Sequence, residues 1–400
     1  MRQSLFNLKW MYRIYYSVLL VSLFAISLSA QQEIPFAKGI TTIQDIKLSS
    51  IAEKIEYIPL ETTEECLLRA DIMDITLTDD YLFVCDHDYV YQFTPQGKFL
   101  RRIGKKGQGP GEYTQSILGV VYNDAKKEII MTDFRTAKAL IYSYNGEYLR
   151  SFKTANELFL TYFKQPDLIY GYSSAFLISR DQSGKDLFVY NDKGKVINDF
   201  RFNYQKGKRY PGLIFSLGLF YGYKGDVFYK NPLEDIVFKI DGKKKIPTYR
   251  FNLEQFEKLN EEEDAILAFD KKKNIGTNLP NPAAEKKINF IKLFETNPFL
   301  FIAFGQENEY RTALYDKAKD KVYRVHSKKT NKPGFTDDLE GGFPFWPVTH
   351  YGKVMISCIG VDTIQEFVKP SEVKGSLKKI LPTLQEDDNP VIQIVYLKEN

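Results

Sequence analysis

One local pattern recurs along the chain at nearly constant spacing, and it restricts the folds open to this sequence. An aromatic-rich segment enters a short turn that contains a glycine, and a second short segment follows. The turn glycines are Gly97, Gly146, Gly194 and Gly242, separated by 49, 48 and 48 residues. Glycine supplies the positive φ that a tight β-hairpin needs. A period of about 48 residues is the size of one four-stranded propeller blade.

The copies also agree upstream of the glycine. The segments 81–86 and 128–133 are both apolar and both end in an aspartate, followed by a polar turn. One interpretation is that Asp86 and Asp133 cap this turn through their side-chain oxygens. The other is that they face inward and, with Asn231, surround a calcium ion in a central channel. Because the aspartates recur with the blade, we favour capping.

Two further units complete the repeat. Residues 287–325 form a fifth unit in which 317–320 replace the turn glycine, and a sixth starts at Phe343 but has no regular fourth strand. The apolar segments 54–60 and 391–396 each lack a partner, so we expect them to pair within the last blade. The sequence therefore predicts an all-β, six-bladed β-propeller that is closed by its N-terminal and C-terminal strands and has no free sheet edge.

Two stretches depart from the repeat, and we expect short helical insertions there. Residues 255–287 contain Glu-rich and Lys-rich runs, and residues 364–389 are amphipathic and charged. Both are expected to decorate the propeller, so residues 31–400 are predicted to form a single domain.

Residues 1–30 have the features of a signal peptide. Arg2, Lys9 and Arg13 precede an uncharged apolar stretch at 15–28, and small residues lead to an expected cleavage site near Ala30. That stretch is shorter than the roughly 20 residues that span a bilayer, so a membrane contact is expected only if the segment is uncleaved. We predict an exported protein, periplasmic or associated with the cell surface. No cysteine ends the apolar stretch, so a lipoprotein anchor is not expected.

Charge and cysteine content limit the partners. The net charge of +4 comes partly from the three basic residues of the first 30, and the remaining chain carries only +1. A nearly neutral chain gives no reason to expect nucleic acid as a partner. The three cysteines, Cys66, Cys85 and Cys358, show no metal-binding spacing and are expected to be small buried side chains, with one disulfide as the alternative.

Three short motifs carry a resemblance to a known family. The segment 101–113, Arg-Arg-Ile-Gly-Lys-Lys-Gly-Gln-Gly-Pro-Gly-Glu-Tyr, resembles the six-bladed propellers of Bacteroidetes, which are distantly similar to NHL-repeat propellers. The segments 58–62 and 388–390 are similar to that family as well. The resemblance covers residues 40–398 and implies an exported propeller. Family members are often lipoproteins and mostly lack an assigned activity, and the missing lipobox cysteine departs from the lipoprotein members.

The first candidate site is the glycine-rich segment between the first and second blades. We expect it to cross the propeller face near the channel mouth, where its backbone amides and two lysines could attract an anion. The alternative is that glycine and proline only shape the crossing, with Glu112 capping the turn. The candidate ligand-binding residues here are Arg102, Lys105, Lys106, Gln108, Glu112 and Tyr113.

The second candidate is the equivalent crossing between blades five and six, expected on the same face. Trp346 is the only tryptophan after the first 30 residues, and it follows two acids, Asp337 and Asp338, and precedes His350. An aromatic ring flanked by acids could stack on a sugar or hold a peptide. The alternative is a packed loop whose aromatic rings fill the blade junction.

No catalytic motif stands out, since nucleophile-elbow and zinc-binding patterns are absent and the histidines at 87, 326 and 350 lie in three different blades. We therefore predict a binding module for a glycan, a peptide or a partner protein, without a cofactor. One alternative is a calcium-dependent hydrolase or lyase with its site at the channel mouth. Another is a structural component of a cell-envelope assembly.

Overall fold

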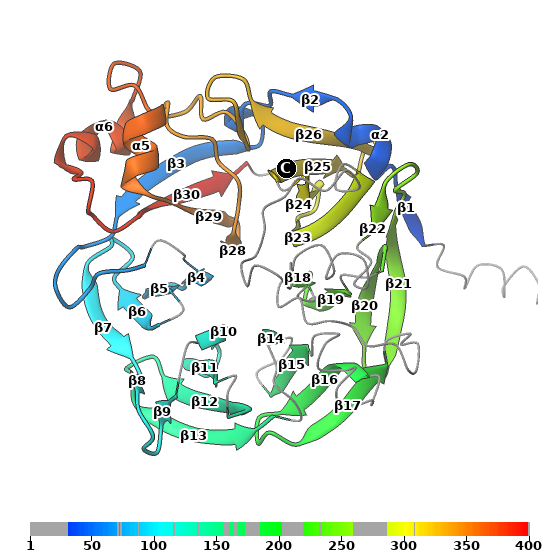
Figure 1. Ribbon diagram of the computed structural model, residues 1–400, viewed down its shortest axis with the longest axis vertical. Coiled ribbons are helices and arrows are strands. Elements are labelled where there is room, and N and C mark those ends of the chain that lie inside the picture. The colour runs from blue at the N-terminus through cyan, green and yellow to red at the C-terminus, as the bar shows by residue number, and fades with distance from the viewer. Residues whose placement is uncertain are drawn as a thin grey trace, which may run out of the picture.

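Six blades, each with four antiparallel strands, surround a common centre in the computed structural model, so the predicted six-bladed propeller is confirmed (Figure 1). The structure describes residues 31–69, 72, 74–86, 88–114, 117–133, 136–154, 160–163, 167–172, 185–201, 219–231, 234–258, 286–307 and 309–398. The predicted signal peptide at 1–30 lies outside these residues. Among them, no helix has the length and apolar character needed to cross a membrane.

Each blade runs from an inner strand beside the centre to an outer strand at the perimeter (Figure 1). Blades one, two and three consist of β4 (Asp74–Leu77), β5 (Leu82–Cys85), β6 (Val90–Phe93) and β7 (Phe99–Ile103); β10 (Ile117–Asn123), β11 (Glu128–Asp133), β12 (Lys138–Ser143) and β13 (Tyr148–Lys153); and β14 (Leu160–Phe163), β15 (Leu168–Tyr172), β16 (Lys185–Asn191) and β17 (Val196–Arg201).

Blades four and five continue the same order, and blade six takes its outer strand from the start of the chain. They consist of β18 (Leu219–Tyr223), β19 (Asp226–Lys230), β20 (Ile236–Asp241) and β21 (Lys244–Phe251); β23 (Lys287–Glu295), β24 (Phe299–Gln306), β25 (Glu309–Asp316) and β26 (Lys321–Ser327); and β28 (Thr349–Tyr351), β29 (Val354–Ile359), β30 (Val391–Leu397) and β3 (Ala52–Pro59).

Burial explains why the middle strands are rich in apolar residues. Every residue of β5 and of β11 is buried, whereas every residue of β13 at the perimeter is exposed or half-buried. A middle strand is covered on both faces by neighbouring blades, so it reads as a continuous apolar run. The cores accordingly lie between blades, as where Phe83 and Val90 of blade one pack with Met131 and Leu140 of blade two.

The turn glycines adopt the backbone conformation that the repeat implies. Their φ values are 85° at Gly97, 85° at Gly146, 78° at Gly194 and 55° at Gly242. In blade five, Asp320 occupies the turn with a φ of 51°. Aspartate is one of the few residues that tolerate this region, which explains how the fifth repeat dispenses with glycine.

The ends of the chain close the ring as predicted. Strand β3 pairs antiparallel with β30, with Ile55 opposite Val395 and Tyr57 opposite Gln393. The side chains of Ile55 and Val395 are both buried in the cluster of blade six. Neither β3 nor β30 therefore has an unpaired buried edge, and the two chain ends are held together.

Residues before β3 form a strap that the repeat analysis did not predict. Strand β1 (Gln32–Ile34) adds in parallel to the outer strand of blade four, and β2 (Ile43–Gln44) adds in parallel to that of blade five. Between them lies α2 (Phe36–Ile40), and η1 (Leu48–Ser50) leads into β3. Figure 1 shows this blue segment passing outside blades four and five before it leads into β3 of blade six. Ile34 and Phe36 are buried, so the strap belongs to the core.

The remaining elements are short. Helices α5 (Val361–Phe367) and α6 (Gly375–Ile380), followed by η3 (Leu381–Thr383), lie between β29 and β30 and confirm the helical insertion expected in blade six. Most of the insertion expected at 255–287 lies outside the described residues, and its start contains the strand β22 (Glu257–Lys258). The other short strands are β8 (Lys105–Lys106), β9 (Glu112–Tyr113) and β27 (Lys332–Pro333).

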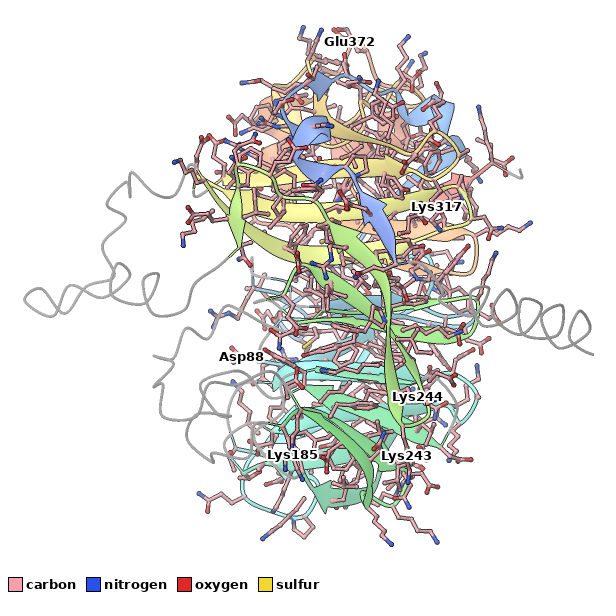
Figure 2. The ribbon with its side chains drawn as sticks, turned by 90° about the vertical axis from the view of Figure 1, so that its right-hand side faces the viewer. Asp88, Lys185, Lys243, Lys244, Lys317 and Glu372 are labelled. Carbon is pink, nitrogen blue, oxygen red and sulfur yellow. The ribbon has the colours of Figure 1, made fainter. Side chains whose placement is uncertain are left out.

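The propeller has two unlike faces. The crossing face carries the inter-blade crossings and the helical insertion of blade six, and the hairpin face carries the glycine turns and the turns that follow the inner strands. Figure 2 shows the molecule edge-on, with Asp88 on the crossing face and Lys317 on the hairpin face.

Replacing Gly97 by alanine is expected to lower the free energy of unfolding by about 2–3 kcal/mol, because the residue has a positive φ and a side chain would meet a backbone atom of β3. A Cβ at Gly97 would lie 2.2 Å from the Pro59 carbonyl oxygen. The control is Gly146→Ala, with the same φ but 3.5 Å to its nearest neighbours, where about 1 kcal/mol is expected. Urea unfolding of both variants measures the difference, and equal losses would contradict the contact with the closing strand.

Candidate functional site

The glycine-rich crossing between blades one and two lies at the perimeter, not near the channel mouth as the sequence analysis expected. Strands β8 and β9 pair in parallel and sit beside the outer strands β7 and β13 (Figure 1). The Tyr142 hydroxyl donates to the Gly111 carbonyl at 2.5 Å, and a Cβ at Gly111 would touch Tyr148 of β13. The crossing is long enough to fold back over the outer strands, and its glycines permit the close approach.

The lysines of this crossing are paired with acids. Lys105 Nζ lies 2.7 Å from Glu112 Oε1 and lowers the pKa of that carboxyl, while Lys106 pairs with Asp88. Glu112 also accepts a hydrogen bond from the Gly109 amide at 2.9 Å, as the capping interpretation expects. The pairing leaves these two cations less available to a free anion.

The other candidate residues of this crossing support the local fold. Arg102 lies over the ring of Tyr89, 4.4 Å from its centroid. Tyr113 is buried and donates its hydroxyl hydrogen bond to the Asp88 carbonyl at 2.8 Å. Gln108 is exposed. The geometry resembles a shaped inter-blade crossing more than a ligand pocket.

The two acids of the second crossing hold loops in place. Asp337 is buried and accepts hydrogen bonds from the Tyr57 hydroxyl at 2.7 Å and from the Gly342 amide at 2.8 Å. Asp338 accepts from the amide and the hydroxyl of Ser49, at 2.9 and 2.6 Å. Both carboxylates therefore tie the crossing to the outer strand of blade six and to the strap.

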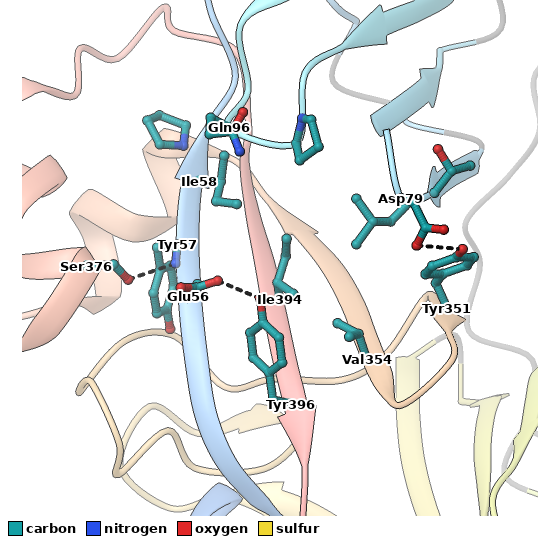
Figure 3. Close-up of a pocket in the computed structure, with 14 residues that line it drawn as sticks. Glu56, Tyr57, Ile58, Asp79, Gln96, Tyr351, Val354, Ser376, Ile394 and Tyr396 are labelled. Carbon is teal, nitrogen blue, oxygen red and sulfur yellow. Dashed lines mark hydrogen bonds between the residues drawn. The ribbon is translucent and has the colours of Figure 1, made fainter. Parts of the chain in front are cut away.

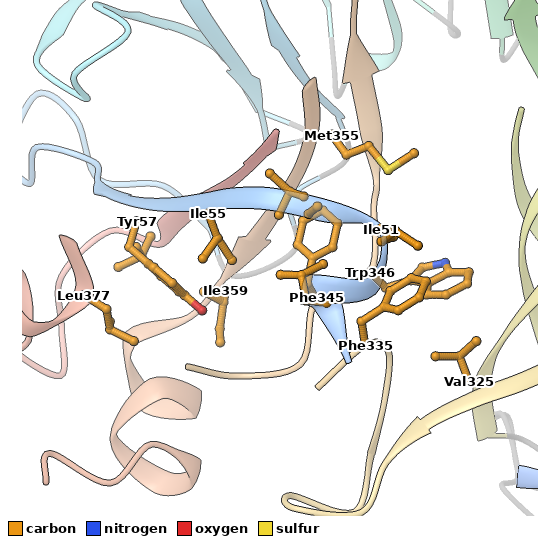
Figure 4. Close-up of a cluster of buried hydrophobic side chains, with 14 of the residues drawn as sticks. Ile51, Ile55, Tyr57, Val325, Phe335, Phe345, Trp346, Met355, Ile359 and Leu377 are labelled. Carbon is orange, nitrogen blue, oxygen red and sulfur yellow. The ribbon is translucent and has the colours of Figure 1, made fainter. Parts of the chain in front are cut away.

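Trp346 does not present the exposed stacking face that the sequence analysis considered. Its side chain is only 6% exposed and stacks on Phe335, with ring centroids 5.4 Å apart and planes 13° apart. Figure 4 shows both rings inside the apolar cluster of blade six, between Val325 and Met355. Trp346 fills the blade junction and is a core residue, so it is not the ligand-stacking residue that the sequence analysis considered.

His350 lies apart from the other candidates. It sits on the inner strand β28 and lines a hairpin-face cavity of about 660 Å³. Its ring is roughly perpendicular to that of Phe294, with ring centroids 5.9 Å apart. Burial and the charge of Lys292 hold the pKa of His350 below its usual range. The structure thus places the predicted residues in three separate regions and does not bring them together as one site.

Of the two recurring aspartates, Asp86 caps its turn, as favoured. Asp86 accepts hydrogen bonds from the amides of Tyr89 at 2.9 Å and Arg69 at 3.0 Å, and Asp133 accepts from the Thr114 amide at 2.9 Å. Asp86 therefore joins its turn to the crossing that precedes the blade, whereas Asp133 binds the crossing and the residues that directly follow Asp133 lie outside the described part of the chain. Within the described ranges, no three His, Cys, Asp or Glu side chains are grouped so that they could hold a metal ion.

A cavity that the sequence analysis did not predict opens on the crossing face, between the inner ends of blades one, five and six. This channel cavity has a volume of about 770 Å³. Its walls come from the crossing into blade one, from β4 and β23, and from the loops at both ends of the blade-six insertion. They contain Leu68, Arg69, Ile72, Asp74, Ile75, Ile291, Lys292, Tyr310, Pro347, Val348, Cys358, Gly360, Val361, Asp362, Thr363, Glu386, Asp387, Asp388 and Pro390.

Two opposite charges reach this cavity from different blades. Asp74 begins β4, and Lys292 lies on β23 immediately after a bulge at Ile291 that redirects the strand. In the described part of the chain, neither side chain has an ion-pair partner within 4.0 Å. An unpaired charge held in a confined space is costly unless a ligand or a distant opposite charge compensates it.

Burial alters the proton affinities of these groups. Desolvation raises the pKa of Asp74 to about 6, against the opposing influence of Lys292 and of the Ile75 amide. Desolvation also lowers the pKa of Lys292, against the charge of Asp74. The neighbouring Tyr122 hydroxyl of blade two is buried without a hydrogen-bond partner among the described residues, and burial and Asp74 raise its pKa. Titratable groups perturbed in this way cluster at functional sites.

Asn389 fixes the wall of the channel cavity. Its side-chain amide donates to the carbonyls of Cys66 at 2.6 Å and Glu61 at 2.7 Å, and its oxygen accepts from the Leu68 amide at 2.8 Å. These bonds join the acidic turn at 386–388 to the crossing into blade one. The motif at 388–390 was visible in the sequence, but its role depends on a contact between residues more than 300 positions apart.

A third cavity, of about 560 Å³ on the hairpin face between blades six and one, has polar groups that already bond to one another. Figure 3 shows the Tyr396 hydroxyl donating to Glu56 at 2.7 Å and the Tyr351 hydroxyl donating to Asp79 at 3.0 Å. Lys54 lies 2.6 Å from Glu56 and lowers its pKa. The channel cavity is therefore the stronger candidate, because two of its charged side chains, Asp74 and Lys292, have no ion-pair partner within 4.0 Å among the described residues.

Comparisons with known proteins agree with the fold. Residues 31–396 match the model of a family described as "Domain of unknown function (DUF4934)". A "Putative exported protein" from Bacteroides fragilis has a similar structure, with a TM-score of 0.68 and 19% identity over 90% of this chain and 100% of that chain. A DUF4221 family member from Bacteroides vulgatus matches with a TM-score of 0.48 and 10% identity, over 87% and 97% of the two chains. No curated protein matches this sequence.

Proposed function

Because the chain belongs to the DUF4934 family, which carries no assigned activity, we propose its function from the geometry of the site: it is an exported binding module whose ligand enters the channel cavity. The observation that carries this proposal is that Asp74 and Lys292 line a cavity of about 770 Å³ and have no ion-pair partner within 4.0 Å among the described residues, while Lys292 lies 5.5 Å from the ring centroid of Phe294. Ligand pockets commonly have volumes of roughly 300–1,000 Å³ and combine apolar walls with a few placed polar groups.

Export is supported by two independent observations. Residues 1–30 contain the basic start, the apolar stretch and the small residues of a signal peptide. The similar structure from Bacteroides fragilis also bears the name of an exported protein. We therefore propose that the propeller works outside the cytoplasm, where a rigid ring with decorated loops suits recognition of an external ligand.

The channel cavity also contains a tyrosine suited to ligand contact. Tyr310 is 47% exposed, although it is a large aromatic residue, and it lines the same cavity as Asp74 and Lys292. An exposed ring can cover an apolar part of a ligand while its hydroxyl remains available for hydrogen bonding. Tyr310 thus takes the contact role that the sequence analysis gave to Trp346.

Binding to the mature chain, residues 31–400, tests the proposal. A set of short peptides and oligosaccharides is screened by calorimetry at neutral pH, with and without a calcium chelator. We expect ligands whose affinity falls at least tenfold in Lys292→Gln and is unchanged in Glu56→Gln, the matched control in the cavity of Figure 3. Ligand affinities that are unchanged in Lys292→Gln would contradict the proposal. Binding or turnover that requires calcium would instead support the hydrolase alternative.

A further inference from the structure

We propose that the channel cavity recognises a short peptide of net positive charge, with a basic group directed to Asp74 and a carboxylate directed to Lys292. The inference rests on the proposed function and names the class of ligand. The starting observation is that Asp74 of β4 and Lys292 of β23 line the cavity from different blades, and that neither has an ion-pair partner within 4.0 Å among the described residues. A ligand that carries both charges compensates both.

The walls between these charges favour a peptide over a sugar. Ile72, Ile75, Ile291 and Val348 line the cavity, and Ile291 is 40% exposed to solvent. Aliphatic surface cannot satisfy the hydroxyl groups of an oligosaccharide, whereas it gains free energy by burying an apolar amino-acid side chain. The strand bulge at Ile291 places this apolar residue and Lys292 side by side on the same wall.

The rim of the cavity is acidic, which favours a basic ligand. Asp362, Glu386 and Asp387 are exposed at the rim, while Asp388 already accepts a hydrogen bond from the Gln385 amide at 2.8 Å. Their summed field attracts cations and repels an acidic ligand before contact. The rim is preorganised because Asn389 holds its backbone against the crossing into blade one.

Three probes distinguish the ligand classes. The basic tetrapeptide Lys-Ile-Val-Arg, its acidic counterpart Glu-Ile-Val-Asp and the neutral sugar cellotetraose are titrated into the mature protein at pH 7.5. All three are small enough for the cavity, and the two peptides share the same apolar centre. We expect the basic peptide to bind at least tenfold more tightly than either other probe.

Variants locate that binding. Asp74→Asn is expected to lower the affinity for the basic peptide about tenfold. Asp74→Glu is expected to retain most of this affinity, and Glu56→Gln to leave it unchanged. If Asp74→Asn does not fold, the exposed rim pair Glu386→Gln and Asp387→Asn is the second test, expected to weaken binding about threefold at low salt. Unchanged affinity in all of these cavity variants would overturn the inference.

The pH dependence gives a further readout. Lys292 and Tyr122 interact electrostatically with Asp74, and Arg69 and the rim acids line the same cavity. Because burial raises the pKa of Asp74 to about 6, its carboxylate is mostly neutral at pH 5 and mostly ionised at pH 7.5. Affinity for the basic peptide is therefore expected to rise about tenfold over this interval. Protonation of His350 at low pH would also lower the affinity for a basic peptide. The rise in affinity with pH is therefore assigned to Asp74 only if it disappears in Asp74→Asn.

The outcomes separate the inference from the proposed function. If cellotetraose or the acidic peptide binds more tightly and depends on Lys292, the cavity is a binding site and the inference is wrong. If the basic peptide fails to bind at millimolar concentration, the inference is also wrong. If, in addition, no ligand from the wider screen depends on Lys292, the proposed function fails with it.

Discussion

Deletion of residues 31–59 is expected to abolish cooperative unfolding, because it removes the closing strand β3 together with the strap. The deletion takes Ile34, Phe36, Leu48 and Ile55 out of the apolar clusters of blades four, five and six. It also leaves β30 with an unpaired edge at the ring opening. Circular dichroism during heating is expected to show no sharp transition, and gel filtration is expected to show aggregates.

Complementation distinguishes ring closure from general damage. A synthetic peptide of residues 31–60, added during refolding, is expected to restore a monomer-sized complex and a cooperative transition. The peptide would restore these features by pairing antiparallel with β30, as β3 does in the intact chain. A truncated chain that unfolds cooperatively without the peptide would contradict the closure.

Trp346→Ala is expected to lower the free energy of unfolding by about 3–5 kcal/mol, the range for removing a large buried aromatic side chain. The indole ring is 6% exposed and packs between Phe335 and Phe301, whose ring centroids lie 5.4 and 5.6 Å away. Urea unfolding measures the loss. At temperatures where the variant is folded, affinity for a channel-cavity ligand is expected to match that of the unmodified chain.

The matched variant Tyr310→Ala is expected to show the opposite behaviour. Tyr310 is 47% exposed, so its removal should change the free energy of unfolding by less than about 1 kcal/mol. Because it lines the channel cavity, ligand affinity should fall several-fold. A loss of binding in Trp346→Ala with retained stability would restore the stacking role that the buried geometry argues against.

The order of strands and turns in each blade was predictable because short segments of the sequence specify it. Gly97, Gly146, Gly194 and Gly242 each need a positive φ, and a residue type that supplies it marks the same turn in every repeat. Buried middle strands such as β11 have an apolar centre, Ile129 to Met131, so they differ in composition from the turns around them. Closure followed from counting strands, since the segments at the two chain ends were left without partners.

The strap was not predictable in the same way. Strand β1 has only three residues and β2 has two, and both add in parallel to outer strands that are distant in sequence. Segments this short carry no periodicity that distinguishes a strand from a loop. Only the burial of Ile34 and Phe36 reveals that the segment is part of the core.

The candidate site was predicted only in part, because the sequence cannot show how a crossing folds. The unusual composition around Lys105 and Trp346 indicated two candidate binding sites. One of these crossings folds back to the perimeter, and the other buries its tryptophan. Asp74 and Lys292 belong to no motif and lie more than 200 residues apart in the sequence. Their shared cavity depends on the order of blades around the ring, and the bulge beside Lys292 leaves no distinct signal in the sequence.

The central claim is that ligands enter the channel cavity, and crystallographic soaking of the mature protein tests it most directly. Crystals are soaked with a mixed set of zwitterionic, cationic, anionic and neutral fragments, and the bound positions are mapped. The account predicts that zwitterionic and cationic fragments gather between Asp74 and Lys292. Fragments that gather only in the hairpin-face cavities, around His350 or Tyr396, would contradict it.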